Sequence, residues 1–446
     1  MTHPLNTAPG GESGGTALLT DHYELTMLQA ALHSGAAERR AVFEVFARHL
    51  PHGRRYGVVA GTGRVLDAIE RFRFGPSDLT FLSDGGIVDE TTLRYLSEYS
   101  FTGDVWGYAE GDCYFPGSPI MVVEGTFAEA VVLETVILSI LNHDCAIASA
   151  ASRMVTAAGG RPLIEMGSRR THEWAAVAAA RAAYVAGFTA TSNLAARRMY
   201  GVPSTGTSAH AFTLAHDSER DAFDAQVSSL GASTTLLVDT YDVPRAVRTA
   251  VSVAGPSLGA VRIDSGDLPA LARSVRGELD SLGATSTRII VTGDLDEYSI
   301  AALAAAPVDG YGVGTSLVTG SGAPTAALVY KLVARSNPSG GMSPVAKRSV
   351  GKPGRGGRKW AVRRRSDSGV AQAEIVSTLP PEIPPNDRGL LVPLIRSGSV
   401  LEYSDVETAR ARHRSATAEL PGYALQLSRG YPAIPTVFTP NGAESE

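Results

Sequence analysis

The chain has 446 residues, of which 44% are hydrophobic and 19% charged, a balance typical of a folded globular protein. Its length fits two or three domains, or one barrel with an accessory domain. The net charge of −5 gives no sign of broad binding to nucleic acid or to a membrane surface. Two cysteines exclude a disulfide framework and a four-cysteine zinc site, and they suit the reducing cytoplasm. Residues 1–16 lack the features of a signal peptide and are expected to form a disordered tail.

Residues 17–145 predict an N-terminal domain of mixed α+β structure. The segment TDHYELTMLQAALHSG predicts a helix that Thr20 or Asp21 caps. Residues 41–50 alternate apolar and polar side chains, as a strand does. Residues 101–125 read as short strands separated by Gly and Pro, which indicates a small β-rich layer.

The longest apolar stretch, residues 129–143, predicts a buried helix. Its apolar side chains recur at helical spacing, and Glu134 interrupts them. The stretch is too short to cross a bilayer, so no membrane span is expected.

Between residues 146 and 335, short apolar strands alternate with helical segments. This pattern is typical of a parallel sheet or barrel. The strands are expected at residues 161–167, 187–193, 203–209, 234–240, 258–266, 287–294 and 308–315, and two of the helices at 172–187 and 267–283.

These predicted strands end in polar residues. In a barrel such ends meet on one face, where active sites lie. The alternative is that some of them cap the helices that follow, which is the expectation for Asp267 and Asp296. The polar strand ends are Arg169, His210, Asp239, Asp264, Thr292, Asp294 and Thr315.

Residues 336–446 form a C-terminal segment that begins with a basic stretch. Nine Lys or Arg and no acid occur from Lys347 to Arg365. Such a run can attract phosphate or nucleic acid, but a solvated hairpin over 345–365 is favoured. A helix is expected later, capped by Ser404 or Asp405.

Two glycine-rich stretches, VTGD (291–294) and GYGVGTS (310–316), follow the last predicted strands. Backbone N–H groups of such loops can approach a phosphate, and Thr315 adds a hydroxyl. The alternative is a pair of tight turns in which glycine only relieves strain. The glycines concerned are Gly293, Gly312 and Gly314.

Charged side chains at other strand ends are candidates for substrate contacts. Asp239 and Asp264 could bind sugar hydroxyls, hold Mg²⁺ on a diphosphate or stabilise a developing cation. Arg262 lies two residues before Asp264 and so shares its face of the strand; a structural Arg–Asp pair is equally open. Arg169, beside Arg170, suits recognition of a carboxylate or phosphate.

His210 follows the small-residue run GTSA. It could act as a general base, a nucleophile or a phosphoryl acceptor. Taken alone, a single histidine at such a position is more often structural.

In chain order, TDHYELTM, EMGSRR, GTSAH, LLVDTYDV, RIDSGDL, VTGDLDE and YGVGTSLVT resemble nicotinate phosphoribosyltransferases, over about residues 19–335. The resemblance implies an α/β fold: an irregular (β/α) barrel with an N-terminal α+β domain and a C-terminal extension packed with it. It implies a cytoplasmic homodimer with active sites at the subunit interface. It also implies transfer of phosphoribosyl from phosphoribosyl pyrophosphate to nicotinate, coupled to ATP hydrolysis through a phosphohistidine.

The resemblance also implies a role for each candidate residue. His210 would be the phosphohistidine. Tyr23, from the partner subunit, would line the nicotinate site with Thr207, Ser208 and Arg262. By the same resemblance, Arg169 would lie by the pyridine ring or the phosphates, Asp239 and Asp264 by the ribose and the Mg²⁺–diphosphate, and Thr315 with its glycines by the phosphoribosyl phosphate.

Substrate choice is expected to depend on Ser208. Related enzymes that take nicotinamide have an acid there, and a neutral serine beside Arg262 and Arg169 favours nicotinate. Mg²⁺ but no zinc is expected, because no cysteine follows Cys145. The alternatives are a quinolinate phosphoribosyltransferase, a non-catalytic sensor of phosphoribosyl metabolites, or an unrelated barrel aldolase or isomerase, which would need a strand-end lysine.

Overall fold

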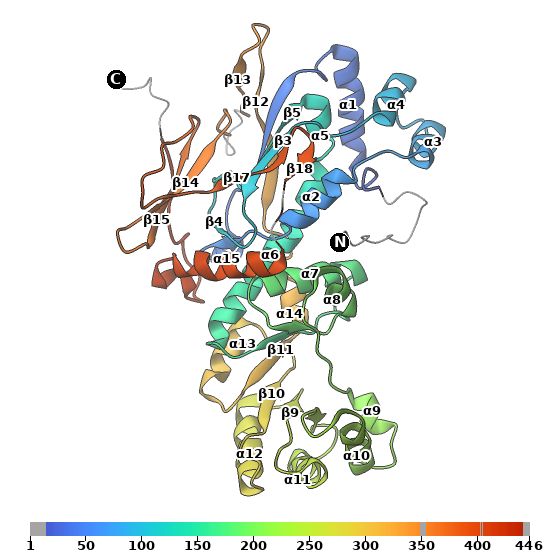
Figure 1. Cartoon of the computed structure of the whole chain (residues 1–446), viewed down its shortest axis with the longest axis vertical. Helices are drawn as coiled ribbons and strands as arrows, with labels where there is room; N and C mark the ends of the chain where they lie inside the picture. Colours follow the sequence, from blue (N-terminus) through green and yellow to red (C-terminus); the bar gives the residue numbers. More distant parts are fainter. Residues whose placement is uncertain (1–14, 348–353, 402, 404, 440–446) are drawn as a thin grey trace. The chain divides into compact units, whose positions relative to one another are not determined.

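The computed structural model describes residues 15–347, 354–401, 403 and 405–439 (Figure 1). The chain divides into two compact units. Unit 1 is drawn from Met1–Ala146 and Thr325–Glu446, and unit 2 is Ile147–Pro324. We describe each unit by itself.

The N-terminal tail expected over residues 1–16 is shorter than predicted at its inner end. Residues 1–14 lie outside the described residues. Thr16 is buried, and its N–H donates to the Arg71 carbonyl at 3.1 Å while its hydroxyl donates to the Ala68 carbonyl at 2.6 Å. Residue 16 therefore belongs to the folded part of unit 1.

Unit 1 is built around an antiparallel sheet of seven strands, to which both ends of the chain contribute (Figure 1). The strand Leu391–Arg396 of the C-terminal segment pairs with the strand Asp104–Tyr108 of the N-terminal domain, so the C-terminal extension packs with that domain as expected. Residues 328–335, within the range predicted for the barrel, also lie in this sheet. In order across the sheet, the strands are β13 (Met342–Pro344), β12 (Leu328–Ser336), β1 (Arg40–Ala47), β5 (Met121–Thr126), β3 (Asp104–Tyr108), β17 (Leu391–Arg396) and β18 (Ser399–Val400).

The strand predicted within residues 41–50 is present as β1, but its burial does not follow the alternation of apolar and polar residues. Six of its side chains from Ala41 to Ala47 are buried, on both faces of the sheet. Both faces are covered by other side chains, because Phe43 and Val45 belong to the main apolar core, Val42 packs in a second apolar cluster and Glu44 pairs with Lys359. Phe43, for example, stacks on Tyr330 of β12 with ring centroids 4.8 Å apart.

The remaining elements of unit 1 surround this sheet. The helix predicted at residues 20–35 is present, with Asp21 at its N-cap. The helix expected in the C-terminal segment is also present, and the Asp405 side chain accepts from the Thr408 N–H. A four-stranded sheet holds β16 (Arg388–Gly389), β14 (Trp360–Arg365), β15 (Ala371–Ser377) and β19 (Thr436–Phe438), and β2 (Gly57–Val58) pairs with β4 (Cys113–Tyr114). The helices are α1 (His22–Ser34), η1 (Pro51–Gly53), α2 (Thr62–Glu70), α3 (Pro76–Asp84), α4 (Glu90–Ser97), α5 (Phe127–Val131), α15 (Val406–Ala418) and η3 (Gly422–Leu425).

The apolar helix predicted at residues 129–143 is longer than expected. Helix α6 (Glu134–Ala158) has 25 residues and follows α5 directly. By length and composition, Phe127–Ala158 is one stretch of the described chain that could cross a membrane, which corrects the expectation that it is too short. However, 61% of its most apolar window is buried within the protein, as in the core helix of a globular fold.

The basic segment over 345–365 is not solvated throughout, as the sequence favoured, because some of its described residues are buried. Its residues 348–353 lie outside the described part, so the hairpin itself stays a prediction. Lys359 is buried, and its ammonium group is 2.8 Å from the Glu44 carboxylate. Arg363 is fully buried and donates to Glu374 at 2.6 Å and to the Cys113 carbonyl at 2.7 Å. The basic residues of β14 are thus partly structural.

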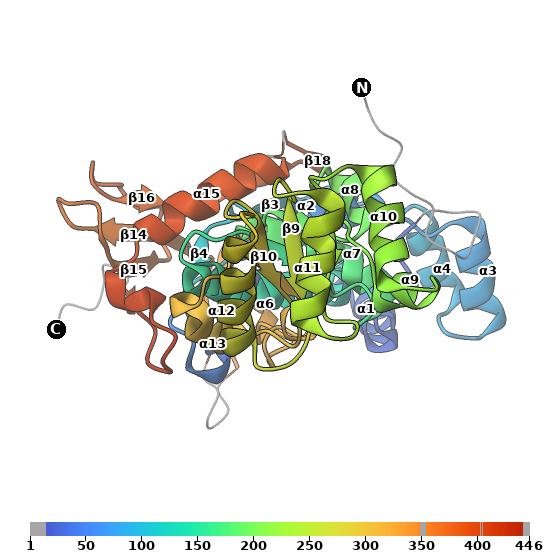
Figure 2. The ribbon, with the colours of Figure 1, turned by 90° about the horizontal axis from the view of Figure 1, so that it is seen from below.

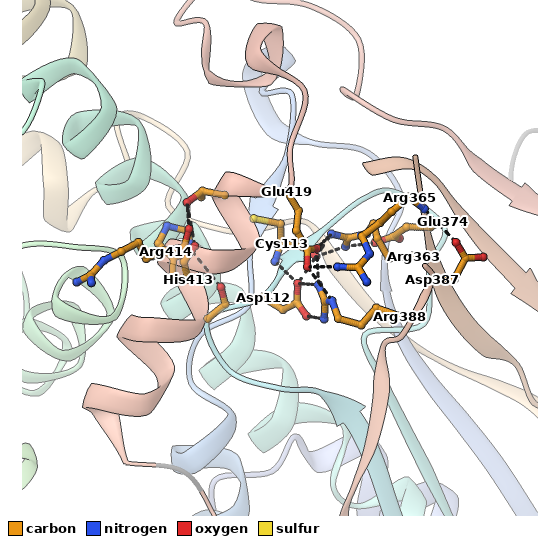
Figure 3. Close-up of polar contacts among 12 residues, drawn as sticks. Asp112, Cys113, Arg363, Arg365, Glu374, Asp387, Arg388, His413, Arg414 and Glu419 are labelled. Atoms are coloured by element: carbon orange, nitrogen blue, oxygen red, sulfur yellow. Dashed lines mark hydrogen bonds and ion pairs between the residues drawn. The ribbon is translucent and has the colours of Figure 1, made fainter. Parts of the chain in front are cut away.

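Figure 3 shows the cluster of charges around Arg363. Arg388 donates two hydrogen bonds to the two carboxylate oxygens of Asp112, and it also donates to Glu419 at 2.9 Å. Asp112 precedes β4, whereas its partners come from the C-terminal segment. The cluster therefore ties that segment to the N-terminal domain inside unit 1.

Unit 2 contains a six-stranded sheet, parallel throughout, that curls into a half-barrel. This confirms the α/β fold class. Helices α10, α11 and α12 lie side by side along β9 and β10 (Figure 2). In order across the sheet, the strands are β7 (Ala190–Thr191), β6 (Leu163–Glu165), β11 (Gly310–Val313), β10 (Arg288–Val291), β9 (Ala260–Ile263) and β8 (Thr235–Leu237). The helices are α7 (Glu173–Val185), α8 (Leu194–Tyr200), α9 (His210–Leu214), α10 (Glu219–Leu230), α11 (Val243–Ala254), α12 (Leu268–Ser281), α13 (Glu297–Ala302), η2 (Leu303–Ala305) and α14 (Thr315–Val318).

One predicted strand of unit 2 is wrong, and two predicted caps are confirmed. Residues 203–209 form an irregular segment with a single bridge between Ser204 and Thr191. Asp267 and Asp296 both cap helices: their carboxylates accept from the first-turn N–H groups of α12 and α13.

Candidate active site

The candidate site of unit 2 lies at the carboxyl edge of the half-barrel. In parallel sheets the loops after the strands gather along this edge, which is where α/β proteins bind ligands. The loops after β6, β8, β9, β10 and β11 carry the residues that the sequence singled out. The irregular segment 203–209 adds Thr207 and Ser208, and it ends at His210.

His210 is the first residue of α9 rather than the end of a strand, which corrects its predicted setting. Its Nδ1 lies 3.1 Å from Thr240 Oγ1. Its Nε2 lies 3.8 Å from Asp239 Oδ1 and 4.0 Å from Asp264 Oδ2. The ring is 39% exposed, so it keeps access to solvent or to a ligand. The two ring nitrogens therefore face different chemical groups.

The two carboxylates near His210 are held in different ways. The Asp239 side chain is 3% exposed, and its Oδ2 accepts from the Asp264 N–H at 2.8 Å and from Ser265 Oγ at 2.9 Å. Its Oδ1 is buried with no hydrogen-bond partner. Asp264 is 39% exposed and accepts from the Thr292 hydroxyl. The site thus offers one buried carboxylate oxygen and one accessible carboxylate.

Arg262 points toward the segment before His210. Its Nη1 donates to Thr207 Oγ1, and also to the Ser208 carbonyl at 3.2 Å. Burial lowers the pKa of the Arg262 guanidinium, and so does the positive charge of Arg169, whereas Asp264 and Asp239 raise it. Arg169 is therefore near enough to influence Arg262. The alternative of a simple structural Arg–Asp pair does not describe this arrangement, because Thr207 and Ser208 accept the bonds of Arg262.

The glycine-rich loops bring backbone close to these side chains. A Cβ at Gly293 would lie 2.2 Å from the Asp264 carbonyl oxygen, and its φ of +105° suits glycine. A Cβ at Gly312 would lie 2.5 Å from Thr292. Gly314 precedes Thr315, the first residue of α14. These loops can present N–H groups to an anion, a role that stays a prediction.

Two residues of the site, Thr240 and Ser265, were not predicted, and Thr292 was predicted only as a polar strand end. Thr240, Ser265 and Thr292 donate to or contact His210, Asp239 and Asp264, respectively. Thr292 was visible as a polar strand end, and Thr240 and Ser265 each directly follow a predicted acid. Their hydroxyls could have been suspected from these positions, but their partners could not.

Tyr23 belongs to unit 1, where it lies exposed in the first turn of α1. Burial of part of the side chain and the nearby carboxylates of Glu134 and Glu24 raise its pKa to about 12. Its predicted contact with a pyridine ring stays a prediction.

Unit 1 also holds a cavity of about 800 Å³ with a basic lining. Arg355 stacks over the Phe438 ring at 4.2 Å, and Glu44 neutralises Lys359. Lys331 pairs with Glu134 at 3.8 Å, and the three other cations have no acid beside them among the described residues of the cavity lining, so the cavity suits an anionic ligand. The cations that line it are Arg48, Lys331, Lys347, Arg355 and Lys359.

Comparison with known proteins identifies the family. Residues 18–142 match the model of the nicotinate phosphoribosyltransferase (NAPRTase) N-terminal domain. The chain is 58% identical over 447 residues to nicotinate phosphoribosyltransferase pncB1 of Mycobacterium tuberculosis, which covers 98% of this chain and 97% of the relative. It is 38% identical over 335 residues to the nicotinate phosphoribosyltransferase of Bacillus subtilis, covering 73% of this chain and 68% of that one.

Solved structures share the fold. Human nicotinic acid phosphoribosyltransferase superposes with a TM-score of 0.79 at 24% identity, over 94% of this chain and 97% of that one. A nicotinate-nucleotide pyrophosphorylase of Pyrococcus furiosus superposes with a TM-score of 0.76 at 23% identity, over 93% and 99%. From the sequence identity and its coverage, the chain belongs to the nicotinate phosphoribosyltransferase family.

Proposed function

We propose that this protein transfers phosphoribosyl from phosphoribosyl pyrophosphate to nicotinate, giving nicotinate mononucleotide and pyrophosphate in NAD salvage. The observation that carries the proposal is that one edge of the sheet holds both a guanidinium group that can bind a carboxylate and two carboxylates next to a histidine. Arg262, bonded to Thr207, can receive a carboxylate, and the carboxylates of Asp239 and Asp264 lie next to His210. Relatives with 58% and 38% identity bear the name of this activity.

In the proposed transfer, the nicotinate ring nitrogen forms a bond to ribose C1 as the bond from C1 to the diphosphate oxygen breaks. The electron pair of that bond leaves with the diphosphate. Positive charge develops on the sugar, and the Asp264 and Asp239 carboxylates can stabilise it. Arg262 and Arg169 bind the nicotinate carboxylate through charge-assisted hydrogen bonds. Because the ring nitrogen is already a nucleophile, the protein mainly positions the two substrates.

His210 is the proposed acceptor of the γ-phosphoryl group of ATP. In the tautomer in which the Nδ1–H group donates to Thr240 Oγ1, Nε2 carries a free electron pair and can attack phosphorus while the bond to ADP breaks. Water then hydrolyses phospho-His210 to phosphate and free histidine. The added charge beside Asp239 and Asp264 would rearrange their contacts and so raise affinity for the phosphoribosyl donor.

The residues present suit a magnesium ion that arrives with its substrates. The buried, unpartnered Asp239 Oδ1 and the accessible Asp264 are oxygen ligands of the kind that Mg²⁺ prefers. No group of three or more His, Cys, Asp or Glu that could hold a metal is found in the described part of the chain. Substrate oxygens would therefore complete the coordination. When bound, the ion would neutralise charge on the diphosphate.

The proposed assembly is a cytoplasmic homodimer with shared active sites, without nucleic acid or a membrane as partner. On α1, Tyr23 and Met27 are exposed four residues apart and so share one face, and Leu19, just before the helix, is also exposed. Such an apolar face suits contact with a second copy. In that dimer, Tyr23 would reach the partner's nicotinate, and the basic cavity of unit 1 would receive phosphate groups.

The test is a turnover assay of the purified protein with nicotinate, nicotinamide or quinolinate, each with and without ATP. We expect nicotinate mononucleotide to form from nicotinate, faster or at lower donor concentration when ATP is present. Product from quinolinate without any ATP effect would instead support the quinolinate enzyme. Absence of product from all three acceptors would support a sensor and refute the proposal.

A further inference from the structure

The end of β6 holds a buried carboxylate that the proposed mechanism does not use. Glu165 is fully buried, and it accepts hydrogen bonds from the Gly167 N–H and from the Thr191 hydroxyl. Burial raises the pKa of this carboxyl. Glu165 and Thr191 are direct neighbours in the parallel pair β6–β7. A buried acid with two donors and no basic partner in these contacts is costly, which suggests that its position serves a purpose.

One side of this pair is hydrogen-bonded to the loop that carries Arg169. The Arg170 N–H donates to the Gly167 carbonyl at 2.8 Å, which closes a turn around Arg169. Asn193 braces the same turn, because its Nδ2 donates to Ser168 Oγ at 3.1 Å. The Asn193 N–H in turn donates to Thr191 Oγ1 at 2.9 Å. The Glu165–Thr191 pair is therefore bonded to both supports of the Arg169 turn.

On the other side, the backbone of Thr191 is hydrogen-bonded to the segment that carries Thr207. The Thr191 N–H donates to the Pro203 carbonyl at 2.9 Å, and the Thr205 N–H donates to the Thr191 carbonyl at 3.0 Å. Two residues farther along, Thr207 accepts the hydrogen bond from Arg262. The supports of Arg169 and of Arg262 thus meet at one buried contact, between Glu165 and Thr191.

We propose that Glu165 is a positioning residue that acts through Thr191 to set the spacing of Arg169 and Arg262 as a two-armed clamp for the carboxylate of the pyridine substrate. This inference rests on the proposed function, since it concerns the same nicotinate site. Two guanidinium groups can grip one carboxylate only if both are placed to within about half an ångström. A carboxylate at position 165 accepts from both donors at once, which an amide of the same shape cannot do unaltered.

The experiment compares steady-state kinetics of the wild type with Glu165→Gln, Thr191→Val, Arg169→Ala and the double variant E165Q/R169A. We expect E165Q and T191V each to raise KM for nicotinate about tenfold while KM for phosphoribosyl pyrophosphate stays within about twofold. Because the spacing of the two arms matters only while both arms are present, the two increases should not multiply in the double variant. Thr191→Ser, which keeps the hydroxyl, should restore KM.

Thr189→Val is the matched control, since the Thr189 hydroxyl donates to the Leu163 carbonyl at 2.9 Å, two residues before each member of the pair. It should leave KM for nicotinate unchanged. The inference is overturned if E165Q and T191V lower the melting temperature without raising KM, or if the effects of E165Q and R169A multiply. If E165Q does not fold, T191V and T191S carry the same test. A wild type that does not use nicotinate refutes the proposed function, and this inference with it.

Discussion

His210 owes its chemical character to two neighbours that the sequence places 29 and 30 positions away. Thr240 holds one ring nitrogen at 3.1 Å, and Asp239 faces the other at 3.8 Å. From the residues alone, a structural histidine was the better interpretation. The resemblance implied the role of phosphoryl acceptor, which stays a prediction, and these contacts describe the setting in which it can be tested.

Replacing His210 tests the ATP coupling. In His210→Ala, ATP hydrolysis linked to product formation should disappear, together with the effect of ATP on KM for the donor, because the nucleophile is gone. The measurement is ADP and nicotinate mononucleotide released in the same reaction. His216→Ala is the control: His216 is half-buried, its Nδ1 lies 2.8 Å from the Phe212 carbonyl oxygen, and the variant should behave as wild type. Unchanged ATP-dependent turnover in H210A would disprove the assignment.

Ser208 is the proposed determinant of acceptor choice. Its carbonyl accepts from Arg262 at 3.2 Å, so an added carboxylate here would both repel a carboxylate substrate and compete for the guanidinium. Ser208→Asp should raise KM for nicotinate by tenfold or more, roughly 1.4 kcal/mol or above. Ser208→Asn, polar but uncharged, should have a smaller effect. Better use of nicotinate by S208D would contradict this interpretation.

At the scale of elements, the strands and caps of unit 2 were largely predictable, and the segment 203–209 was not. Strand prediction rests on apolar patterning, and six of seven expected strands are present. Residues 203–209 are small and polar, and their shape depends on hydrogen bonds to Thr191 of β7. Such a segment has no pattern of its own from which to infer its conformation.

A substitution in the loop after β10 tests how closely its backbone packs against the end of β9. Gly293→Ala would place a Cβ against the Asp264 carbonyl at a φ of +105°, so it should destabilise unit 2 by about 1–3 kcal/mol and weaken donor binding. Unfolding in urea and KM for the donor measure both effects.

The matched control is Gly277→Ala, in the exposed middle of α12 with open space at its Cβ. This variant should gain up to about 1 kcal/mol from helix propensity. A G293A variant as stable and active as wild type would show that the glycine there is dispensable.

At the scale of the whole molecule, unit 1 depends on contacts between distant parts of the chain. Arg388 bonds Asp112 across 276 positions, and Arg363 bonds the Cys113 carbonyl across 250. Because these partners lie so far apart in the chain, the sequence suggested a solvated basic hairpin, whereas the fold has buried ion pairs. Composition and spacing carry no signal for partners so far apart.

The helix α15 gives unit 1 a pH dependence. His413 is buried against the Gly111 carbonyl, 3.0 Å from its Nδ1, and burial lowers its pKa to about 4. Between that value and its usual pKa of about 6.5, the unfolded chain binds a proton that the folded chain does not. Stability should therefore fall as pH drops, by roughly 2 kcal/mol between pH 7 and pH 5.

The variant His413→Gln should lose this contribution to stability. The contributions of other titrating groups, including Glu24, are the same in both proteins and cancel in the comparison. The difference in unfolding free energy between wild type and H413Q is measured in urea at several pH values. His22→Gln, at an exposed histidine at the start of α1, is the control and should show no such trend. A difference independent of pH would contradict the predicted role of His413.

The sequence by itself determined which residue types stand at the strand ends, that the chain alternates strands and helices, and that its motifs resemble one family. These features are local: periodicity, capping residues and short motifs lie within a few positions of each other. Only the tertiary structure decided that Thr240 orients His210, that Arg262 binds Thr207, and that Glu165 meets Thr191. These contacts depend on strand order and register, which bring together residues that chain distance separates.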